Sequence, residues 1–309
     1  MPKILVVGSL NLDLTLYGAN KTPEPGELVS CSGYAYAPGG KGANQAAALV
    51  KLGAEAPLVG CVGSDRNGKL LQAALESHGI RTDYLRTDGS AQTGLAVIFT
   101  DSTGQSRLYG IPGANMALDA ADIPVILNAE KPDMVLMQLE MPMQTAIDTY
   151  RMAKAQGIPV FLDAGPAQKV PLKEFQGILI ISPNEAETCA MTGIRVTDEA
   201  SALRAAWEIY QRALPQYVLL KLGARGALLY DGKTGRRFPA RKVRAVDTTA
   251  AGDTFNAAVC FRLCQGDSLE RSITFANAAA AITVSRRGAL TSIPTEAEVT
   301  ALISGTDNG

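Results

Sequence analysis

The chain has 309 residues, of which 47% are hydrophobic and 19% charged, and its net charge is −1. This composition excludes an intrinsically disordered protein, because it supplies enough apolar surface to form a core. Lys and Arg number 29 against 30 Asp and Glu. Nucleic acids and anionic membranes bind proteins with a basic excess, so the sequence argues against both as partners.

Cysteine and histidine offer little for metal chemistry. The five cysteines include no Cys-x-x-Cys pair, and the single histidine, His78, lies in a Ser-His-Gly segment that is typical of a helix end. The N-terminus does not resemble a signal peptide, and the longest uncharged stretch, 272–285, is too short to span a bilayer. We therefore expect a cytoplasmic protein with free cysteines.

Short β-rich runs alternate with longer helical patterns along the chain. This rhythm predicts an α/β fold with a mainly parallel sheet and helices on both faces. The predicted strands are 4–7, 57–62, 134–137, 160–162, 178–181 and 217–220, and the predicted helices are 43–52, 67–77, 145–155, 200–214, 254–263 and 272–285.

Two regions interrupt this rhythm, at about 12–37 and 93–110. Both have strand character and little helical pattern, and the second has a predicted turn at 102–104. We expect them to form a small extra sheet inserted in the main domain. No interdomain linker is evident, so residues 1–309 are predicted to form a single domain, with a frayed tail from Gly305.

The segment 247–256 carries the strongest chemical signal. A strand-like run, 242–246, precedes it and an apolar helix follows, so Ala250, Ala251 and Gly252 lie where a helix begins. The unpaired N–H groups there favour an anion, and small side chains let it approach. Asp253 in the first turn could accept a proton from an attacking hydroxyl, or could be only a helix-start residue favoured by the dipole. Thr254 or Asp247 could cap the helix start without Asp253, which favours the chemical role.

A second segment, 39–46, places three glycines before a helix. Gly40 predicts that the backbone closely approaches another group, and Lys41 and Asn44 supply polar side chains beside it. A plain turn is the alternative. The segment 63–70 matches a phosphate-binding P-loop until Leu70, where the magnesium-binding hydroxyl is missing. Ser64 or Asp65 capping the next helix explains it better.

Polar side chains also follow the ends of several predicted strands, where ligands bind in open α/β sheets. The oxygens of Asn184, Glu185 and Glu187 suit a hydrated magnesium ion, and the glycine turn 223–226 suits a nucleotide. Taken one at a time, each group could equally be ordinary loop chemistry. These groups are Asn11 with Asp13; Glu140; Asn184 with Glu185 and Glu187; and Lys221 to Gly226.

Together these segments resemble the ribokinase branch of the PfkB carbohydrate kinase family. The resemblance extends from Gly8 to Ala289; the segment 247–253 is similar to the family's C-terminal motif and 39–44 to its N-terminal motif. It implies a three-layer α/β/α domain with a small β-sheet lid, and a homodimer that forms through the lid.

The resemblance also implies residue roles. Asp253 becomes the base, and the backbone of Ala250, Ala251 and Gly252 becomes the anion hole. Sugar hydroxyls would be held by Asn11, Asp13, Gly40, Lys41, Asn44, Glu140 and Asp253. ATP would contact Asn184, Lys221, Gly223, Gly226, Gly252 and Asn277, with Glu187 acting on Mg²⁺. A monovalent cation, usually K⁺, would lie among Asp247, Thr249, Thr283, Arg286, Gly288 and Ser292.

The implied activity is transfer of the γ-phosphate of ATP to the 5-hydroxyl of D-ribose, giving ribose 5-phosphate and ADP. Two alternatives stay open: a kinase for another furanose or a nucleoside (deoxyribose, fructose or pseudouridine), and a non-catalytic sugar-binding regulator. The chain departs from the family pattern at Lys221, where Thr is common, and at 163–166, where Asp-Ala-Gly-Pro replaces Asn-Pro-Ala-Pro.

Overall fold

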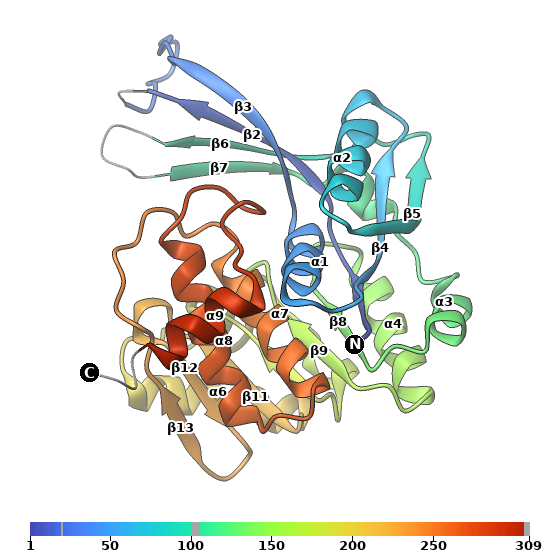
Figure 1. The fold of residues 1–309 in the computed structure, drawn as a ribbon, viewed down its shortest axis with the longest axis vertical. Coiled ribbons are helices and arrows are strands. Elements are labelled where there is room, and N and C mark those ends of the chain that lie inside the picture. Colours follow the sequence, from blue (N-terminus) through green and yellow to red (C-terminus); the bar gives the residue numbers. More distant parts are fainter. Residues whose placement is uncertain (20, 101–105, 306–309) are drawn as a thin grey trace.

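A computed structural model of the chain describes residues 1–19, 21–100 and 106–305. A large sheet and a small sheet organise the fold (Figure 1). The large sheet contains β1 (Ile4–Val7), β4 (Pro57–Gly63), β5 (Arg81–Asp88), β8 (Met134–Met137), β9 (Val160–Asp163), β10 (Ile180–Ser182), β11 (Tyr217–Lys221), β12 (Ala227–Tyr230) and β13 (Gly235–Phe238). The small sheet contains β2 (Asn11–Tyr17), β3 (Gly33–Gly39), β6 (Gly94–Thr100) and β7 (Ser106–Ile111).

The helices of the described residues pack around the large sheet. They are α1 (Lys41–Leu52), α2 (Arg66–Ser77), α3 (Ile123–Glu130), α4 (Met143–Ala155), α5 (Glu185–Thr192), α6 (Glu199–Ala213), α7 (Ala251–Cys264), α8 (Leu269–Val284) and α9 (Glu296–Ser304). Short 3₁₀ turns occur at Gly113–Ala117, Leu172–Phe175 and Gly223–Arg225.

The large sheet is mainly parallel, in the order β13-β12-β11-β10-β9-β8-β1-β4-β5. Neighbours from β5 to β11 pair in parallel, and β12 and β13 add an antiparallel edge. The fold prediction, a mainly parallel sheet with helices and a second small sheet, is therefore confirmed.

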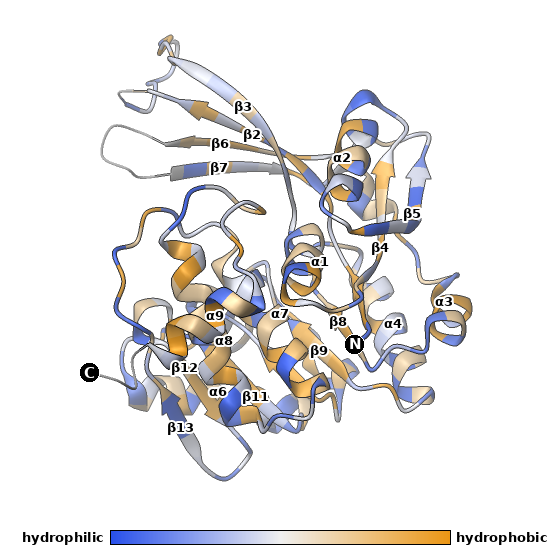
Figure 2. Cartoon of the chain, in the orientation of Figure 1, coloured by the Kyte–Doolittle hydropathy of each residue, from blue (hydrophilic) through white to orange (hydrophobic). Residues whose placement is uncertain are grey.

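The strands of this sheet are buried on both faces, which explains their continuous apolar sequences. In β1, Ile4 and Val6 join the hydrophobic core beneath α1, α2, α7, α8 and α9, whereas Leu5 and Val7 join the opposite core beneath α3, α4 and α6. This alternation follows from the two-residue period of a strand. Figure 2 shows the resulting apolar interior between the helical layers.

The small sheet projects from one side of the large sheet (Figure 1). Its order is β3-β2-β6-β7, with β2 and β6 parallel and the outer pairs antiparallel. Its strands lie within or at the margins of the two regions that interrupt the α/β rhythm. The first residue of β2 is Asn11, so the sheet begins directly at a candidate site residue.

Several local predictions can be compared with the structure. Asp65 caps α2 by accepting a hydrogen bond from Gly68 N, as expected for the P-loop-like segment. The prediction of a strand-like run at 242–246 is wrong. These residues form no strand and instead cross the end of α8, where Val246 N donates to Val284 O. The predicted turn at 102–104 lies outside the described residues, as does most of the predicted tail.

Among the described residues, no helix combines the length and the apolar character that crossing a bilayer requires. The Ser272–Ser285 stretch instead belongs to α8, which packs in the core through Ile273, Phe275 and Ala276.

Candidate active site

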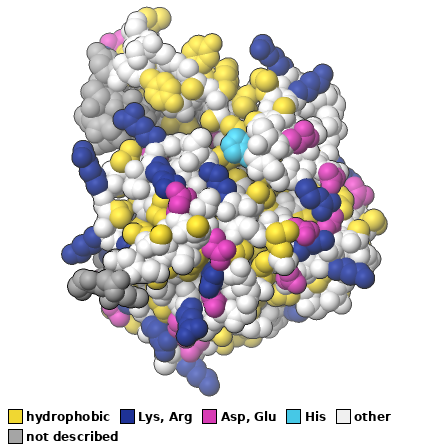
Figure 3. Space-filling model, viewed as in Figure 1, with side chains coloured by type: hydrophobic (Ala, Val, Ile, Leu, Met, Phe, Trp, Pro, Cys, Tyr) yellow, Lys and Arg dark blue, Asp and Glu magenta, His cyan; other side chains and the backbone are white. Residues whose placement is uncertain are grey.

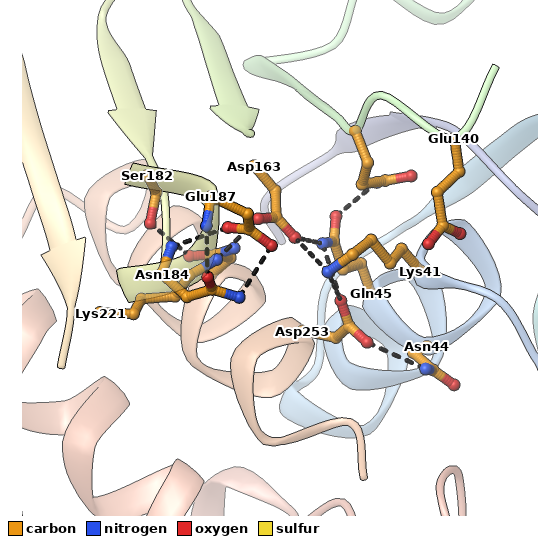
Figure 4. Close-up of polar contacts among 12 residues, drawn as sticks. Lys41, Asn44, Gln45, Glu140, Asp163, Ser182, Asn184, Glu187, Lys221 and Asp253 are labelled. Atoms are coloured by element: carbon orange, nitrogen blue, oxygen red, sulfur yellow. Dashed lines mark hydrogen bonds and ion pairs between the residues drawn. The ribbon is translucent and has the colours of Figure 1, made fainter. Parts of the chain in front are cut away.

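The predicted site residues gather at the carboxyl edge of the large sheet. β1, β9 and β11 end there, and α1 and α7 begin there. Figure 4 shows side chains from β9, β11, α1 and α7 converging around Asp163. This is the edge where ligands bind in open α/β sheets, because loops and helix N-termini meet there.

Asp253 lies in the first turn of α7 and points into the protein, with 6% of its surface exposed. Its Oδ2 accepts a hydrogen bond from Asn44 Nδ2 at 2.9 Å, and its Oδ1 accepts one from Gln45 Nε2 at 3.1 Å. Lys41 Nζ lies 3.7 Å from Oδ1. The carboxylate is therefore held by three side chains of α1 and does not cap its own helix, which favours a chemical role.

The start of α7 is open to an anion. No side chain caps it, and Ala250 adopts a left-handed conformation with φ of 60°. Ala251 N makes a long bond of 3.3 Å to Thr248 O, whereas no protein group within the described residues accepts from the N–H of Ala250 or Gly252. Unpaired N–H groups at a helix start attract an anion, and the unusual conformation of Ala250 is of the kind found at functional sites.

Two glycines let α1 begin against β1 and β2. A Cβ on Gly39 would lie 2.1 Å from Asp13 Oδ2, and one on Gly40 would lie 2.8 Å from Ser9 O. Gly40 also has φ of 89°, a conformation that side chains disfavour. The motif 39–46 is therefore more than a turn, because it brings Lys41, Asn44 and Gln45 to Asp253.

A group of polar atoms faces the same space from the small-sheet side. Asn11 Oδ1 accepts from Asn115 Nδ2 at 2.9 Å, and Ser9 Oγ donates to Glu140 and accepts from Lys41 N. Asp13 Oδ1 and Asn44 Oδ1 are buried without a hydrogen-bond partner. Because buried polar atoms normally have partners, these two oxygens indicate a ligand that donates hydrogen bonds.

The electrostatics of this group are unusual. Burial, with the nearby charges of Glu140 and Asp253, raises the pKa of Asp13 to about 7. Burial likewise raises the pKa of Glu140. Burial alone would lower the pKa of Lys41, but the surrounding carboxylates, Asp163 foremost, hold it well above 10.5. Strongly perturbed groups that cluster in this way are typical of functional sites.

Asp163 connects the two halves of the site, a role that sequence reasoning did not assign. It is fully buried at the end of β9. Its Oδ2 accepts from Gln45 Nε2 at 2.9 Å and Lys41 Nζ at 3.2 Å, and its Oδ1 accepts from Lys221 Nζ at 2.6 Å. The only sequence signal was that residues 163 and 221 both depart from the family pattern.

The side chains of Ser9, Gln45 and Asn115 were also missed. Gln45 lies within the glycine-rich segment but was given no role, although it contacts both Asp163 and Asp253. Ser9 and Asn115 hold Glu140 and Asn11 from positions that carry no motif of their own.

The predicted nucleotide residues lie on the other side of Asp163. Asn184 and Glu187 form the capping box of α5, and a backbone bridge pairs Asn184 with Lys221. Gly226 has φ of 85°, and a Cβ there would lie 2.0 Å from Phe238 O, so the turn after β11 requires glycine. Gly223 also has a positive φ, of 54°.

Asn277 is not brought into this hydrogen-bonded cluster. Its Nδ2 donates to Phe238 O at 3.4 Å and Pro239 O at 3.3 Å. It therefore braces the segment after β13, and a nucleotide role for it stays a prediction.

The donor set at the predicted monovalent-cation site partly fits such an ion. Asp247 Oδ2 accepts from Gly288 N, and its Oδ1 accepts from Thr249 N and Oγ1. These contacts bring the two loops together around a carboxylate whose pKa remains below 3.8 despite burial, because hydrogen bonds from Thr249 and Gly288 stabilise its charge. Hard cations prefer such oxygen-rich surroundings.

Three other predicted cation residues have internal partners. Thr283 Oγ1 donates to Ala279 O, Ser292 Oγ to Ala289 O, and Arg286 pairs with Glu298. Any contribution of these residues to a cation would therefore come from their backbone carbonyls or remaining lone pairs.

For magnesium, the described residues offer a carboxylate but no cluster. No three Asp, Glu, His or Cys side chains among them could hold a metal ion together. Both oxygens of Glu187 accept hydrogen bonds from Asn184. This fits an ion that keeps most of its waters and binds mainly to phosphate.

Comparison with known proteins identifies the family of this chain. The family model described as "pfkB family carbohydrate kinase" matches residues 1–296. The chain belongs to this family. It is similar to the ribokinase of Haemophilus influenzae, with 37% identity over 299 residues that cover 96% of each chain.

Solved structures agree. A structure of Arabidopsis thaliana ribokinase complexed with ribose and ATP has a TM-score of 0.90 at 34% identity and covers 98% of each chain. A ribokinase from Cryptococcus neoformans in complex with ADP has a TM-score of 0.83 at 28% identity, covering 98% of this chain and all of that one. The fold that the sequence resemblance implies is thus shared with ribokinases over nearly the full length.

The environment of Asp13 yields a direct prediction. In the protein without ligand, we expect its carboxyl group to titrate with a midpoint near pH 7, measurable by carbon-13 NMR. Glu140→Gln lowers this midpoint, because it removes a neighbouring negative charge. Asp88, whose pKa is held below 3.8 by hydrogen bonds from Ser90 and Ala91, serves as the internal reference. An Asp13 midpoint near 4 would contradict the prediction.

Proposed function

We propose that the protein is an ATP-dependent ribose kinase, which transfers the γ-phosphate to the 5-hydroxyl of D-ribose and produces ribose 5-phosphate and ADP. The observation that carries this proposal is that the buried Asp253 carboxylate lies in the first turn of α7, a helix whose start no side chain caps. The family, the ribokinase relatives and the neighbour bound to ribose and ATP support it.

The chemistry follows from these two features. Asp253 accepts the proton of the 5-hydroxyl as its oxygen attacks the γ-phosphorus, and the bond from phosphorus to the β–γ bridging oxygen breaks in line. The N–H groups at the start of α7 stabilise the charge on the transferring group. The proton then passes from Asp253 to solvent, which restores the carboxylate for the next turnover.

The side chains of α1 keep the base ready. Asn44 and Gln45 each donate to one oxygen of Asp253, so its geometry is set before the sugar binds. The nearby ammonium of Lys41 would counter the negative charge that accumulates during transfer. Such preorganised groups contribute most to phosphoryl transfer, because the reaction requires mainly positioning and charge stabilisation.

A small polyol suits the sugar side. Asn11, Asp13, Asn44 and Glu140 present amide and carboxylate groups, two of whose buried oxygens have no partner. Ribose hydroxyls can donate to both. A nucleoside would require apolar or aromatic surface for its base, and only 6% of the chain is aromatic.

The small sheet acts as a lid in this proposal. Asn11 and Asp13 lie on β2 and so belong to the sheet itself, paired with Gly39 and Ala37 of β3. Movement of the sheet therefore changes the sugar contacts directly. Closure over the substrates would exclude water and limit ATP hydrolysis.

Magnesium would be held near Glu187 and Asn184, and when bound it would neutralise charge on the ATP phosphates. Potassium would be held by Asp247 together with nearby backbone carbonyls, where it would add positive charge behind the start of α7. The five cysteines are all free, which supports a location in the reducing cytoplasm.

We also propose a homodimer that forms through the small sheet. Paired residues on neighbouring strands share a face, so the register places Tyr34, Tyr36, Tyr109 and Ile111 together, on the face opposite Asp13. All four side chains are about half exposed or more. Figure 3 shows hydrophobic side chains gathered over this part of the molecule, and a second copy of the same apolar face would cover them.

An ADP-release assay tests the proposed activity. The panel contains ribose, deoxyribose, fructose, adenosine, pseudouridine and fructose 6-phosphate, and we expect ribose to give the highest kcat/KM. Asp253→Asn should lower kcat by about 10²- to 10⁴-fold, because it removes the general base. Near-parental turnover in this variant would contradict the assignment of Asp253 as the general base. A higher kcat/KM for another compound of the panel would contradict ribose as the substrate.

The potassium proposal has a salt test. Turnover should fall markedly when potassium is replaced by tetramethylammonium, because the larger cation cannot enter the loops around Asp247. Asp247→Asn should be slow in both salts and respond little to the exchange. If the parent protein turns over at the same rate in the two salts, the proposed cation site is contradicted.

Sedimentation tests the dimer. Tyr36→Lys combined with Tyr109→Lys should convert a dimer into a monomer, because two charges would be buried in an apolar interface. Leu108→Lys is the matched control, since Leu108 is also exposed on β7 but lies on the opposite face. A parent protein that sediments as a monomer would refute the proposal.

A further inference from the structure

We propose that Asp163 is a positioning residue for phosphoryl transfer, which holds the ammonium group of Lys221 at the anion-binding start of α7. The inference rests on the proposed kinase function and goes beyond it, because residue 163 has no assigned role in that function.

The first support is the way that Asp163 is held. It is fully buried, and both of its oxygens are occupied, Oδ1 by Lys221 and Oδ2 by Lys41 and Gln45. The Lys221 contact is the shortest of these, at 2.6 Å. Figure 4 shows Asp163 between the group around Asp253 and the group around Asn184 and Glu187. The carboxylate thus joins the sugar side to the nucleotide side.

The second support is the place of Lys221. It is the last residue of β11, and 11% of its side chain is exposed. A Cβ on Gly252 would lie 4.0 Å from Lys221 Cδ, so the stem of the lysine passes beside the anion hole. An ammonium group has three N–H donors, and within the described part of the chain Asp163 is its one hydrogen-bond acceptor. The remaining donors are available to a phosphate.

A lysine needs such a partner to be positioned. Its four-carbon stem is flexible and its charge is compact, so a single contact at the ammonium decides where the charge lies. Lys41 depends less on Asp163, because its contact is longer, at 3.2 Å, and Asp253 is a second charged neighbour. Asp163 therefore controls Lys221 more than it controls Lys41.

The pairing also accounts for two departures from the family pattern. Residues 163 and 221 are positions at which the chain departs from the pattern that it resembles, and they carry Asp and Lys in direct contact. Without Lys221, Asp163 would keep Lys41 as a charged partner, whereas without Asp163 the Lys221 ammonium would lose its acceptor within the described residues, which is unfavourable. The two departures thus form one ion pair, which places an additional cation beside the anion hole.

This arrangement predicts different effects for the two partners. Loss of Lys221 removes a contact to phosphate. Loss of the Asp163 charge keeps the Lys221 ammonium in the protein but no longer holds it in one position. It also removes a negative charge that opposes nucleotide binding. Asp163→Asn should therefore impair turnover without weakening ADP binding.

A double-mutant cycle of Asp163→Asn and Lys221→Thr tests the pair. Dissociation constants for ADP and adenosine are measured by calorimetry without sugar, and kcat is measured with ribose and ATP. In Lys221→Thr, ADP should bind about 10- to 100-fold more weakly and adenosine as in the parent, because a charged hydrogen bond to phosphate is lost. In Asp163→Asn, kcat should fall about 10-fold or more while ADP binds at least as tightly as in the parent.

The coupling identifies how Asp163 acts. The fall in kcat caused by Asp163→Asn should be much smaller in the Lys221→Thr background than in the parent. Equal falls in both backgrounds, or an Asp163→Asn variant with near-parental kcat, would overturn the proposal. So would ADP binding that weakens in Asp163→Asn as much as in Lys221→Thr.

Two comparisons keep the outcome clear. Glu130→Gln is the matched control, because Glu130 is another buried carboxylate that pairs with Lys3 and Arg81, before β8 and away from the site, and its loss should change neither ADP affinity nor kcat. If Asp163→Asn does not fold, the double variant is compared with Lys221→Thr, and a large further loss of kcat would overturn the proposal. A parent that binds ADP but does not phosphorylate ribose would contradict the proposed function and leave the Lys221 contact to be judged by ADP binding.

Discussion

The candidate site depends on the contact between the first turn of α7 and the first turns of α1. Asp253 from one helix is bonded by Asn44 and Gln45 of the other, and Lys41 lies beside them. The two helices lie far apart in the sequence, and both begin at the carboxyl edge of the large sheet. Because no side chain caps α7, N–H groups at its start have no protein acceptor within the described residues, and Asp253 lies in the same turn.

The charges of the site are arranged around this contact. Lys41 and Lys221 are held by the two oxygens of Asp163, while Asp13 and Glu140 are partly buried acids among the predicted sugar-binding residues, both with raised pKa values. Such a site would be costly if its charges were unpaired. Pairing with the two lysines keeps the pKa of Asp163 below 3.8 despite its burial, so the carboxylate stays charged. Among the polar atoms without partners, those of Asp13 and Asn44 are expected to meet the substrate.

The small sheet links substrate contact to shape. Asn11 and Asp13 belong to β2, so in the proposed function the strand that would contact the sugar is also part of the lid. One face of the sheet carries Asp13, and the other carries exposed aromatic side chains. A single element therefore serves substrate binding on one side and, in the proposed dimer, association on the other. This division follows from the alternation of side chains along a strand.

Much of this could be predicted from the sequence by itself. The buried runs in β1, β8 and β9 and the helical patterns between them specified a parallel α/β sheet, because strands buried on both faces are continuously apolar. The glycines of 39–42 and the small residues of 250–252 marked close backbone approaches, because few other residues permit them. What required tertiary structure was the pairing of side chains across strands. Asp163, Ser9 and Asn115 carry no local pattern, and the position of Gln45 within the glycine-rich segment did not indicate its contacts. All four were linked to the candidate site only when the folded sheet brought distant strand ends together, since a hydrogen bond depends on distance in space and not on separation along the chain.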